Sequence, residues 1–393
     1  MSDYSFDGTV LGQHATVSDP VSGDQTWEKV VSKNLGLDLN MFNNRLSLTT
    51  DFYIRDTKGI LGKGKSLPSI YGASEPQMNA NNLRTKGYEL VLGWRDSFKL
   101  AGSTFSYGIT GTFSDYTAEY TKCDNPTGLI GDPYVGKKYG EIWGYKVDGL
   151  FRNDKEAAEY ASRIDLSTVA SGYYTATGAY GKGVRGGDIK YLDLNGDNIV
   201  NGGKGTLDDP GDRRVIGNSS PRYQYGASLN FSWYGFDVSV FMQGIGRLDW
   251  YPGADNLRFW GPYCRPYATF VPKNFMSQVW SEENPDAYFP RARAYTSLNS
   301  NSGTAYYTND RYLQNLAYCR LKNLTIGYTI PRRLTSKVGI KECRIYFSGE
   351  NLATWSALKS DFLDPEQAAA DSDKKANVYP WCKTYSIGLN LTF

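Results

Sequence analysis

The stretch YGASLNFSWYGFDVSVFMQG, residues 225–244, alternates apolar with small or polar side chains. Tyr225, Leu229 and Phe231 share one parity, and Gly, Ser and Asn stand between them. After Tyr234 and Gly235 the alternation resumes. Because a period of two places successive side chains on opposite faces of a strand, this stretch is predicted to be a β-hairpin. Its apolar face covers a second layer if the protein is soluble and meets lipid if the protein is a membrane barrel.

The composition leaves both possibilities open. Of the 393 residues, 31 are Tyr and 42 are Gly, which favours strands and turns over helices. The formal net charge of +2 provides no basic surface, so nucleic acid is not an expected partner. No run of about 18 apolar residues is present, which excludes a transmembrane helix but not a barrel, whose strands alternate.

About nine strands are predicted along the chain. They cover residues 26–40, 45–61, 82–96, 103–120, 222–247 (both strands of the hairpin), 312–330, 342–355 and 383–393. Connections after the odd-numbered strands are short and those after the even-numbered strands are long, so every long connection lies at one edge of the sheet. Outer-membrane barrels have this asymmetry, whereas a Greek-key sandwich has no reason to keep it.

The polar positions of these strands support the barrel. They carry mostly Ser, Thr, Asn, Gly and Gln, which suit a hydrated barrel interior, and aromatic residues cluster near strand ends as in membrane girdles. The predicted fold is therefore all-β, an antiparallel transmembrane β-barrel portion with long extracellular loops. Tyr225, Leu229, Phe231, Val238 and Val240 are expected to face lipid, and Ser228, Asn230 and Ser239 the lumen.

Several longer motifs follow one another in a fixed order. They are WEKVVSKNLGLDLNMFNNRLSLTTDFYIRDTKGIL, MNANNLRTKGYELVLGWRD, GDIKYLDLNGD, DRRVIGNSSPRYQYGASLNFSWYGFDVSVFMQGIG, YLQNLAYCRLKNLTIGYTIP, IYFSGENLATW and YPWCKTYSIGLNLTF. In this order they resemble the carboxy-terminal part of SusC/RagA-type TonB-dependent outer-membrane transporters of Bacteroidetes. The resemblance runs from about Trp27 to Phe393.

The resemblance implies that residues 1–393 are the carboxy-terminal part of a TonB-dependent receptor β-barrel, about nine strands of a presumed 22-strand barrel. The family's plug domain and first barrel strands are absent from the sequence. A partial sheet cannot close, and open edges in lipid leave backbone groups unsatisfied. The chain is therefore expected to be a fragment that does not transport by itself. The aromatic Phe393 is expected at the periplasmic rim.

The function that the resemblance implies is import of glycans or peptides across the outer membrane of a Gram-negative bacterium. The expected partners are a SusD-like surface lipoprotein, TonB through the missing amino-terminal region, and outer-membrane lipid. The alternative is a soluble or surface-attached carbohydrate-binding β-sandwich protein. A glycan-degrading enzyme would need a catalytic carboxylate pair. No pair stands out, so neither catalytic residues nor a catalytic cofactor are expected.

The segment DLNGDNIVN, which begins at Asp193, is the one ion-binding signal. Asp193, Asn195 and Asp197 are spaced like positions 1, 3 and 5 of a calcium loop, but position 12 is Lys204, so the segment is not an EF-hand. Two interpretations stay open. One is a Ca²⁺ ion held by Asp193, Asn195, Asp197, the carbonyl of Ile199, and Asp212, which aligns with the family's closing acidic residue. The other is a solvated Asx-turn without an ion.

The long connections are rich in aromatic side chains, which stack on sugars and anchor protein interfaces. The candidates for contact with substrate or partner are Tyr134, Tyr139, Trp143, Tyr145, Trp250, Tyr251, Trp260, Tyr263 and Tyr267. The alternative is that these rings pack against one another within the loops.

Overall fold

The computed structural model describes residues 2–5, 11–14, 21–23, 25–63, 70, 76–175, 183–264, 271, 273–293, 304–360, 362–370 and 379–393, with only the backbone for residues 2–5 and 11–14. Two strands near the amino-terminus, β1 (Ser2–Ser5) and β2 (Leu11–His14), pair with each other. No helix among the described residues is both long and apolar enough to cross a membrane.

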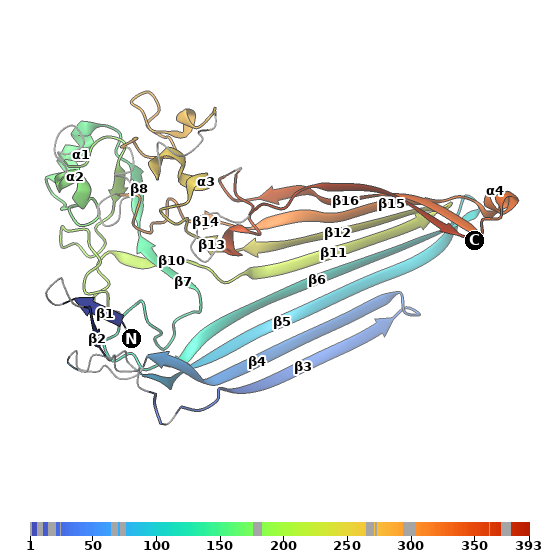
Figure 1. Cartoon of the computed structure of the whole chain (residues 1–393), viewed down its shortest axis with the longest axis horizontal. Coiled ribbons are helices and arrows are strands. Elements are labelled where there is room, and N and C mark those ends of the chain that lie inside the picture. Colours follow the sequence, from blue (N-terminus) through green and yellow to red (C-terminus); the bar gives the residue numbers. More distant parts are fainter. Residues whose placement is uncertain are drawn as a thin grey trace.

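One antiparallel sheet of nine strands dominates the molecule (Figure 1). Its strands are β3 (Lys29–Met41), β4 (Leu46–Lys63), β5 (Gln77–Leu100), β6 (Ser103–Lys122), β11 (Arg222–Trp233), β12 (Phe236–Arg247), β15 (Tyr318–Thr329), β16 (Glu342–Ser356) and β17 (Thr384–Thr392). In the sheet each strand lies beside its neighbours in this sequence order. The predicted all-β antiparallel fold is confirmed.

Several strand boundaries differ from the prediction by a few residues, and two of them differ by five or six. Strand β5 begins at Gln77 rather than at residue 82, because residues 77–81 still pair with the end of β4 across two register shifts. Strand β15 begins at Tyr318 rather than at residue 312, because Gln314 pairs with Trp250 in a separate two-stranded sheet. Neither segment has an apolar alternation that reveals its pairing.

The strand register places apolar and polar side chains on opposite faces of the sheet. Leu229 lies opposite Val240 on β12 and Ile109 on β6, and all three belong to the apolar face. One residue further along, Asn230 lies opposite Ser239 and Gly108. The predicted sidedness of the hairpin is therefore present in the register, although Phe241 also falls on the polar face, opposite Ser228.

Short and long connections lie at opposite ends of the sheet. Residues 42–45, 101–102, 234–235 and 330–341 form the short end, where the carboxy-terminus also lies (Figure 1). Two of these turns place a non-glycine residue and then a glycine in the left-handed region, with φ of 49° at Tyr234 and 83° at Gly235. That pair of angles matches the twist of a two-residue hairpin.

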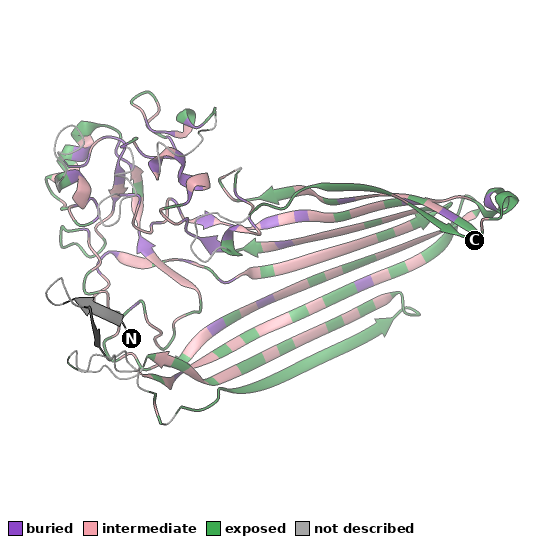
Figure 2. Cartoon of the chain, in the orientation of Figure 1, coloured by how far each residue is buried: buried purple, intermediate pink, exposed green. Residues whose placement is uncertain are grey.

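The long connections at the other end fold into a separate layer of short elements, called here the loop cluster. It contains β7 (Glu141–Tyr145), β8 (Val147–Leu150), β9 (Ile189–Tyr191), β10 (Arg213–Asn218), β13 (Asp249–Trp250), β14 (Gln314–Asn315), α1 (Asp154–Ala161), α2 (Ser171–Thr175) and α3 (Leu257–Trp260). Short 3-10 turns lie at Gly261–Tyr263, Met276–Gln278 and Ala368–Ala370. At the short end the 330–341 connection holds α4 (Arg332–Thr335) and a 3-10 turn at Ser336–Val338. The main hydrophobic core of the described residues lies in the loop cluster and runs from Tyr145 to Ala368 (Figure 2).

The sheet is open at both edges. Among the described strands, β3 pairs only with β4, and β17 pairs only with β16. Every residue of β3 is exposed, as are all residues of β17 except one. Both edges therefore present unpaired backbone donors and acceptors.

Candidate functional site

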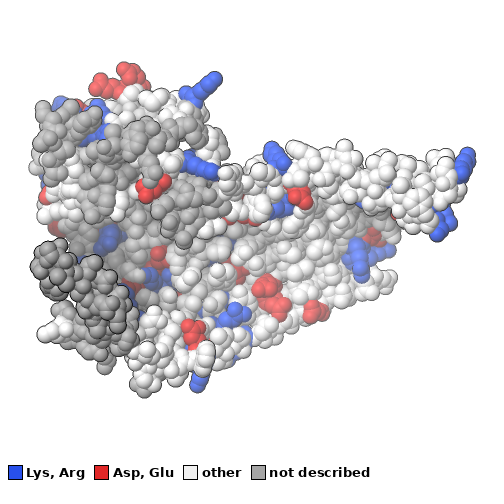
Figure 3. All heavy atoms as spheres, in the orientation of Figure 1, with Lys and Arg blue, Asp and Glu red and all other residues white. Residues whose placement is uncertain are grey.

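The polar face of the sheet carries small hydroxyl and amide side chains with a few ion pairs. One row across it contains Ser239, Thr325 and Ser348. Near the short end the Arg344 guanidinium donates to both carboxylate oxygens of Asp237, at 2.9 and 2.5 Å. Charged atoms gather in separate clusters on the visible surface of the sheet, and most of that surface is uncharged (Figure 3).

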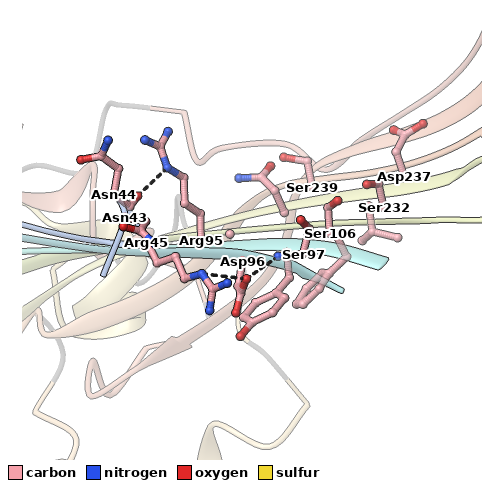
Figure 4. Close-up of a pocket in the computed structure, with 15 residues that line it drawn as sticks. Asn43, Asn44, Arg45, Arg95, Asp96, Ser97, Ser106, Ser232, Asp237 and Ser239 are labelled. Carbon is pink, nitrogen blue, oxygen red and sulfur yellow. Dashed lines mark hydrogen bonds and ion pairs between the residues drawn. The ribbon is translucent and has the colours of Figure 1, made fainter. Parts of the chain in front are cut away.

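A polar hollow of about 840 Å³ lies at the short end (Figure 4). Its lining comes from the 42–45 turn and strands β5, β6, β11 and β12. The Nε of Arg95 donates to the carbonyl of Asn44 at 3.0 Å, and Arg45 pairs with Asp96 at 3.2 Å. Both arginines therefore bind the 42–45 turn to strand β5.

A buried ionic network fixes the 357–383 connection to the sheet. Arg320 lies on the polar face opposite Gln243, and its side chain is only 2% exposed. One guanidinium nitrogen donates to both oxygens of Asp364 at 2.7 Å, and another donates to Glu366 at 2.9 Å. Lys322 completes the network through Glu366 at 2.8 Å. Charge-assisted bonds at such distances are strong and directional, so they fix this connection against the polar face.

Beside this network lies a groove, called here the Arg258 groove. It consists of two adjoining hollows, of about 150 and 610 Å³, which share Arg258, Ser360 and Phe362. The larger hollow includes Arg320 and Thr354 on the polar face of the sheet. The smaller one is lined by phenylalanines of the loop cluster. The groove therefore joins the polar face of the sheet to the loop cluster.

The predicted ion-binding segment forms a compact loop with its carboxylates turned towards backbone N–H groups. Asp193 accepts from Gly196 at 2.7 Å and from Asn198 at 2.9 Å, and Asp197 accepts from Ile199 at 2.8 Å. Asp212, fully buried, accepts from the N–H of Leu194 at 2.7 Å and of Asn201 at 2.9 Å.

Asn195 bridges within the same turn, because its side-chain amide donates to Asp197 at 3.0 Å. Within the described part of the chain no group of three or more His, Cys, Asp or Glu side chains is placed to hold a metal. These hydrogen bonds are those of Asx-turns. Calcium binding stays a prediction.

The aromatic candidates fall into two groups. Trp250, Tyr251, Trp260 and Tyr263 are all buried in the core of the loop cluster, together with Tyr145. Tyr139 is 54% exposed, Tyr134 and Trp143 are half-buried, and Tyr267 lies outside the described residues. The hydroxyl of Tyr134 donates to Glu141 at 2.6 Å, and burial together with that carboxylate raises the pKa of Tyr134 to about 12. Of the eight candidates among the described residues, Tyr139 presents the most open ring.

One buried ion pair in the loop cluster has no counterpart in the sequence prediction. Asp188 and Arg293 meet at 2.6 Å with side chains 1% and 5% exposed. Burial raises the pKa of Asp188 to about 7, against the opposing effects of Arg293 and the backbone N–H of Arg185. The pair connects residues that are 105 positions apart in the sequence. Neither Arg258 nor Arg320 was singled out from the sequence, and the partners of Arg320 lie 44 and 46 positions further along the chain.

Comparison with known proteins gives a consistent result. No family model matches the chain. It is 25% identical to TonB-dependent receptor P3 of Formosa agariphila over 100% of its own length and 36% of that protein. It is 22% identical to TonB-dependent receptor SusC of Bacteroides thetaiotaomicron over 93% of its length and 32% of that receptor.

Among solved structures, that of the RagAB peptide transporter superposes with a TM-score of 0.65 at 20% identity, covering 100% of this chain and 38% of that one. An open-open state of the RagAB peptide importer gives the same TM-score at 21% identity, with 100% and 37% covered. The chain thus spans about a third of the length of the curated relatives it matches.

Proposed function

We propose that the chain, which is similar to TonB-dependent receptors and to the RagAB peptide transporter, belongs to a SusC/RagA-type TonB-dependent transporter and forms one stretch of the barrel wall of an outer-membrane importer. The observation that carries the proposal is the sheet itself. It has an apolar face, a polar face, and all its long connections at one end. A soluble protein would have to cover the apolar face with a second layer, and no described element packs across it in the structure (Figure 1).

The open edges support a larger assembly. In lipid, an unpaired strand edge leaves backbone groups without hydrogen bonds, at a cost of several kcal/mol per group. We propose that strands of the rest of the protein pair with β3 and β17 and close the ring. The chain would then be the carboxy-terminal part of the barrel, and transport would require the whole protein.

The orientation follows from the distribution of connections. Long loops of outer-membrane barrels are extracellular and short turns are periplasmic. The loop cluster would then face the cell exterior. Phe393 would lie at the periplasmic rim, because the carbonyl of its neighbour Thr392 accepts from Lys341 at 2.7 Å in the short 330–341 connection.

We propose import of glycans or peptides as the activity, a SusD-like lipoprotein over the loop cluster as the partner, and TonB as the source of energy. The relatives named above are receptors and transporters, which supports transport rather than catalysis. Peptide transport is a property of RagAB, which is only 20% identical to this chain, so peptides and glycans stay equal candidates here.

The test uses the full-length protein in its native membrane. Deleting the gene should abolish growth on, or uptake of, one oligomeric nutrient, and the gene on a plasmid should restore it. Loss of uptake on removal of TonB supports active transport, whereas unchanged uptake would contradict it. A protein that stays monodisperse without detergent would instead support the soluble β-sandwich.

Two epitope tags test the orientation. A tag between residues 371 and 378, in the β16–β17 connection, should bind antibody on intact cells. A tag after Phe393 should bind only after the outer membrane is permeabilised. The reverse pattern would overturn the proposed topology.

A further inference from the structure

We propose that the Arg258 groove binds a carboxylate-bearing ligand, with Arg258 as the charged anchor and the adjoining phenylalanines as an apolar wall. The proposal rests on the proposed function, because it names the chemistry that the importer selects at the loop end of its polar face.

The described residues that line the groove carry more cations than carboxylates. The smaller hollow is lined by Arg258 and Lys359, and no acidic residue is among the described residues that line it. Among the described residues that line the larger hollow, Asp364 is the one carboxylate. The described lining of the groove therefore holds Arg258, Lys359 and Arg320 against the single carboxylate of Asp364.

That one carboxylate is already occupied. Each oxygen of Asp364 accepts from Arg320 at 2.7 Å. One also accepts the N–H of Glu366 at 2.9 Å, and the other that of Trp381 at 3.2 Å. A carboxylate with four such bonds has little capacity left for Arg258. Glu366 is likewise taken up by Arg320 and Lys322.

Arg258 itself makes no side-chain ion pair with any described residue. It is half-buried on α3, at the junction of the two hollows. A planar guanidinium with free donors recognises a carboxylate through two parallel bonds. Lys359 lies 4.7 Å from the ring centre of Tyr288, so the aromatic face engages it and Arg258 is the better anchor.

The walls of the groove indicate what the carboxylate is attached to. Phe259, Phe275 and Phe289 are buried and line the smaller hollow, and Phe362, at its mouth, is 39% exposed. Tyr379, 86% exposed, stands at the larger hollow. Rings of this kind stack on flat or apolar groups and on sugar rings. An acidic peptide with a bulky side chain and an acidic oligosaccharide share the required chemistry.

The position of the groove agrees with a role in substrate selection. Arg320 and Thr354 belong to the polar face of β15 and β16, just below the loop cluster. In a closed barrel this is the mouth of the lumen, where an incoming ligand passes. Preorganised side chains at such a point discriminate between ligands at little entropic cost.

The experiment measures binding to the full-length transporter in detergent by isothermal titration calorimetry. One arm compares the blocked tripeptide Phe-Glu-Phe with Phe-Gln-Phe. The other compares trigalacturonate with maltotriose, so the two arms distinguish the peptide from the acidic glycan. The acidic ligand of at least one pair should bind more tightly. Arg258→Gln should reduce that affinity about tenfold, which corresponds to one charged hydrogen-bonded pair, and leave the neutral ligand unchanged.

Two further variants control for structure and charge. Arg333→Gln removes an arginine from α4 at the opposite end of the sheet and should have no effect. Arg258→Lys keeps the positive charge but cannot donate two parallel hydrogen bonds, so it should retain part of the affinity.

Equal binding of acidic and neutral ligands in both arms, or equal weakening of both by Arg258→Gln, would overturn the proposal. Suppose that the transporter prefers the acidic ligand while cells lacking TonB still take that ligand up normally. This result would support ligand binding in the Arg258 groove and contradict the proposed TonB-dependent transport.

Discussion

The sheet and the loop cluster keep their apolar side chains in opposite places. On the sheet, Leu35 is 73% exposed and Ile387 83% exposed, whereas Phe151 and Trp260 in the loop cluster are fully buried (Figure 2). The loop cluster therefore has a core of the kind that water stabilises. The sheet lacks one, and its stability depends on what surrounds it. The loop cluster is therefore stabilised by surrounding water, whereas the apolar face of the sheet is stabilised by an apolar environment.

The largest expected effect comes from opening the core of the loop cluster. Trp260 packs against Phe259 and Tyr312 with ring centres about 5 Å apart. Trp260→Ala should destabilise the cluster by about 3–5 kcal/mol, because it leaves a large cavity. Protease protection of the loops in the detergent-solubilised transporter measures this. The exposed Tyr139→Ala should change stability by less than about 0.5 kcal/mol. Equal losses would remove the distinction between core and surface in the loop cluster.

The next effect distinguishes the two faces of the sheet. Leu229→Arg places a charge on the apolar face near mid-strand and should cost about 2–4 kcal/mol in a bilayer, whereas Asn230→Arg, one residue on, should cost much less. Urea unfolding of the full-length barrel in lipid vesicles measures both. Similar penalties at the two positions would contradict a lipid-facing apolar side.

A smaller effect is expected where the loop cluster relies on a polar side chain. Asp212 is buried and accepts from the backbone N–H groups of Leu194 and Asn201. Asp212→Ala leaves these donors unpaired and should cost about 1–3 kcal/mol, while Asp212→Asn keeps one acceptor and should cost less. Hydrogen exchange at residues 193–201 reports the difference. Identical exchange in wild type and Asp212→Ala would show that the carboxylate does not hold the loop.

A pH effect of about 0.5 kcal/mol is expected at α1, where solvent screens the interaction. Burial raises the pKa of Glu156, but the N–H of Arg152 and the Lys190 ammonium outweigh it, so the pKa in the fold is below its usual 4.5. The stabilisation is therefore complete above pH 4.5 and is lost as the pH falls through the lowered value. Thermal unfolding is measured from pH 6 to pH 3. The wild type should lose about 0.5 kcal/mol of stability over this range that Glu156→Gln does not lose. A variant that keeps the full acid sensitivity would assign it elsewhere.

The smallest effect is expected from calcium, since the carboxylates of the 193–212 loop already accept backbone donors. If the loop binds calcium, titrating Ca²⁺ into the full-length transporter should give a calorimetric heat of binding. Asp197→Ala should remove this heat while the strands stay folded. If Ca²⁺ gives no heat with the wild type, the loop consists of Asx-turns alone.

The strands were predictable because their period is local. In residues 222–247, the alternation of apolar and polar side chains and the Tyr234–Gly235 turn predict a hairpin. The structure has β11 and β12 there. The packing of the loop cluster was not predictable, because its aromatic residues do not recur at a regular spacing in the sequence. Sequence alone could not distinguish Trp260, fully buried, from Tyr139, which is exposed. Arg320 and Asp364 pair across 44 positions, and only the three-dimensional fold brings such residues together.

The span of the loop core has a consequence for the order of events during assembly. Its members run from Tyr145 to Ala368, on three separate connections. A growing or translocating chain therefore cannot complete this core until residue 368 has arrived, shortly before β17. Long-range closure of this kind is slow, so the loop core and the last strand become available at nearly the same moment. Until residue 368 arrives, apolar residues of the incomplete loop core are exposed, and the chain must be kept from aggregating during that interval.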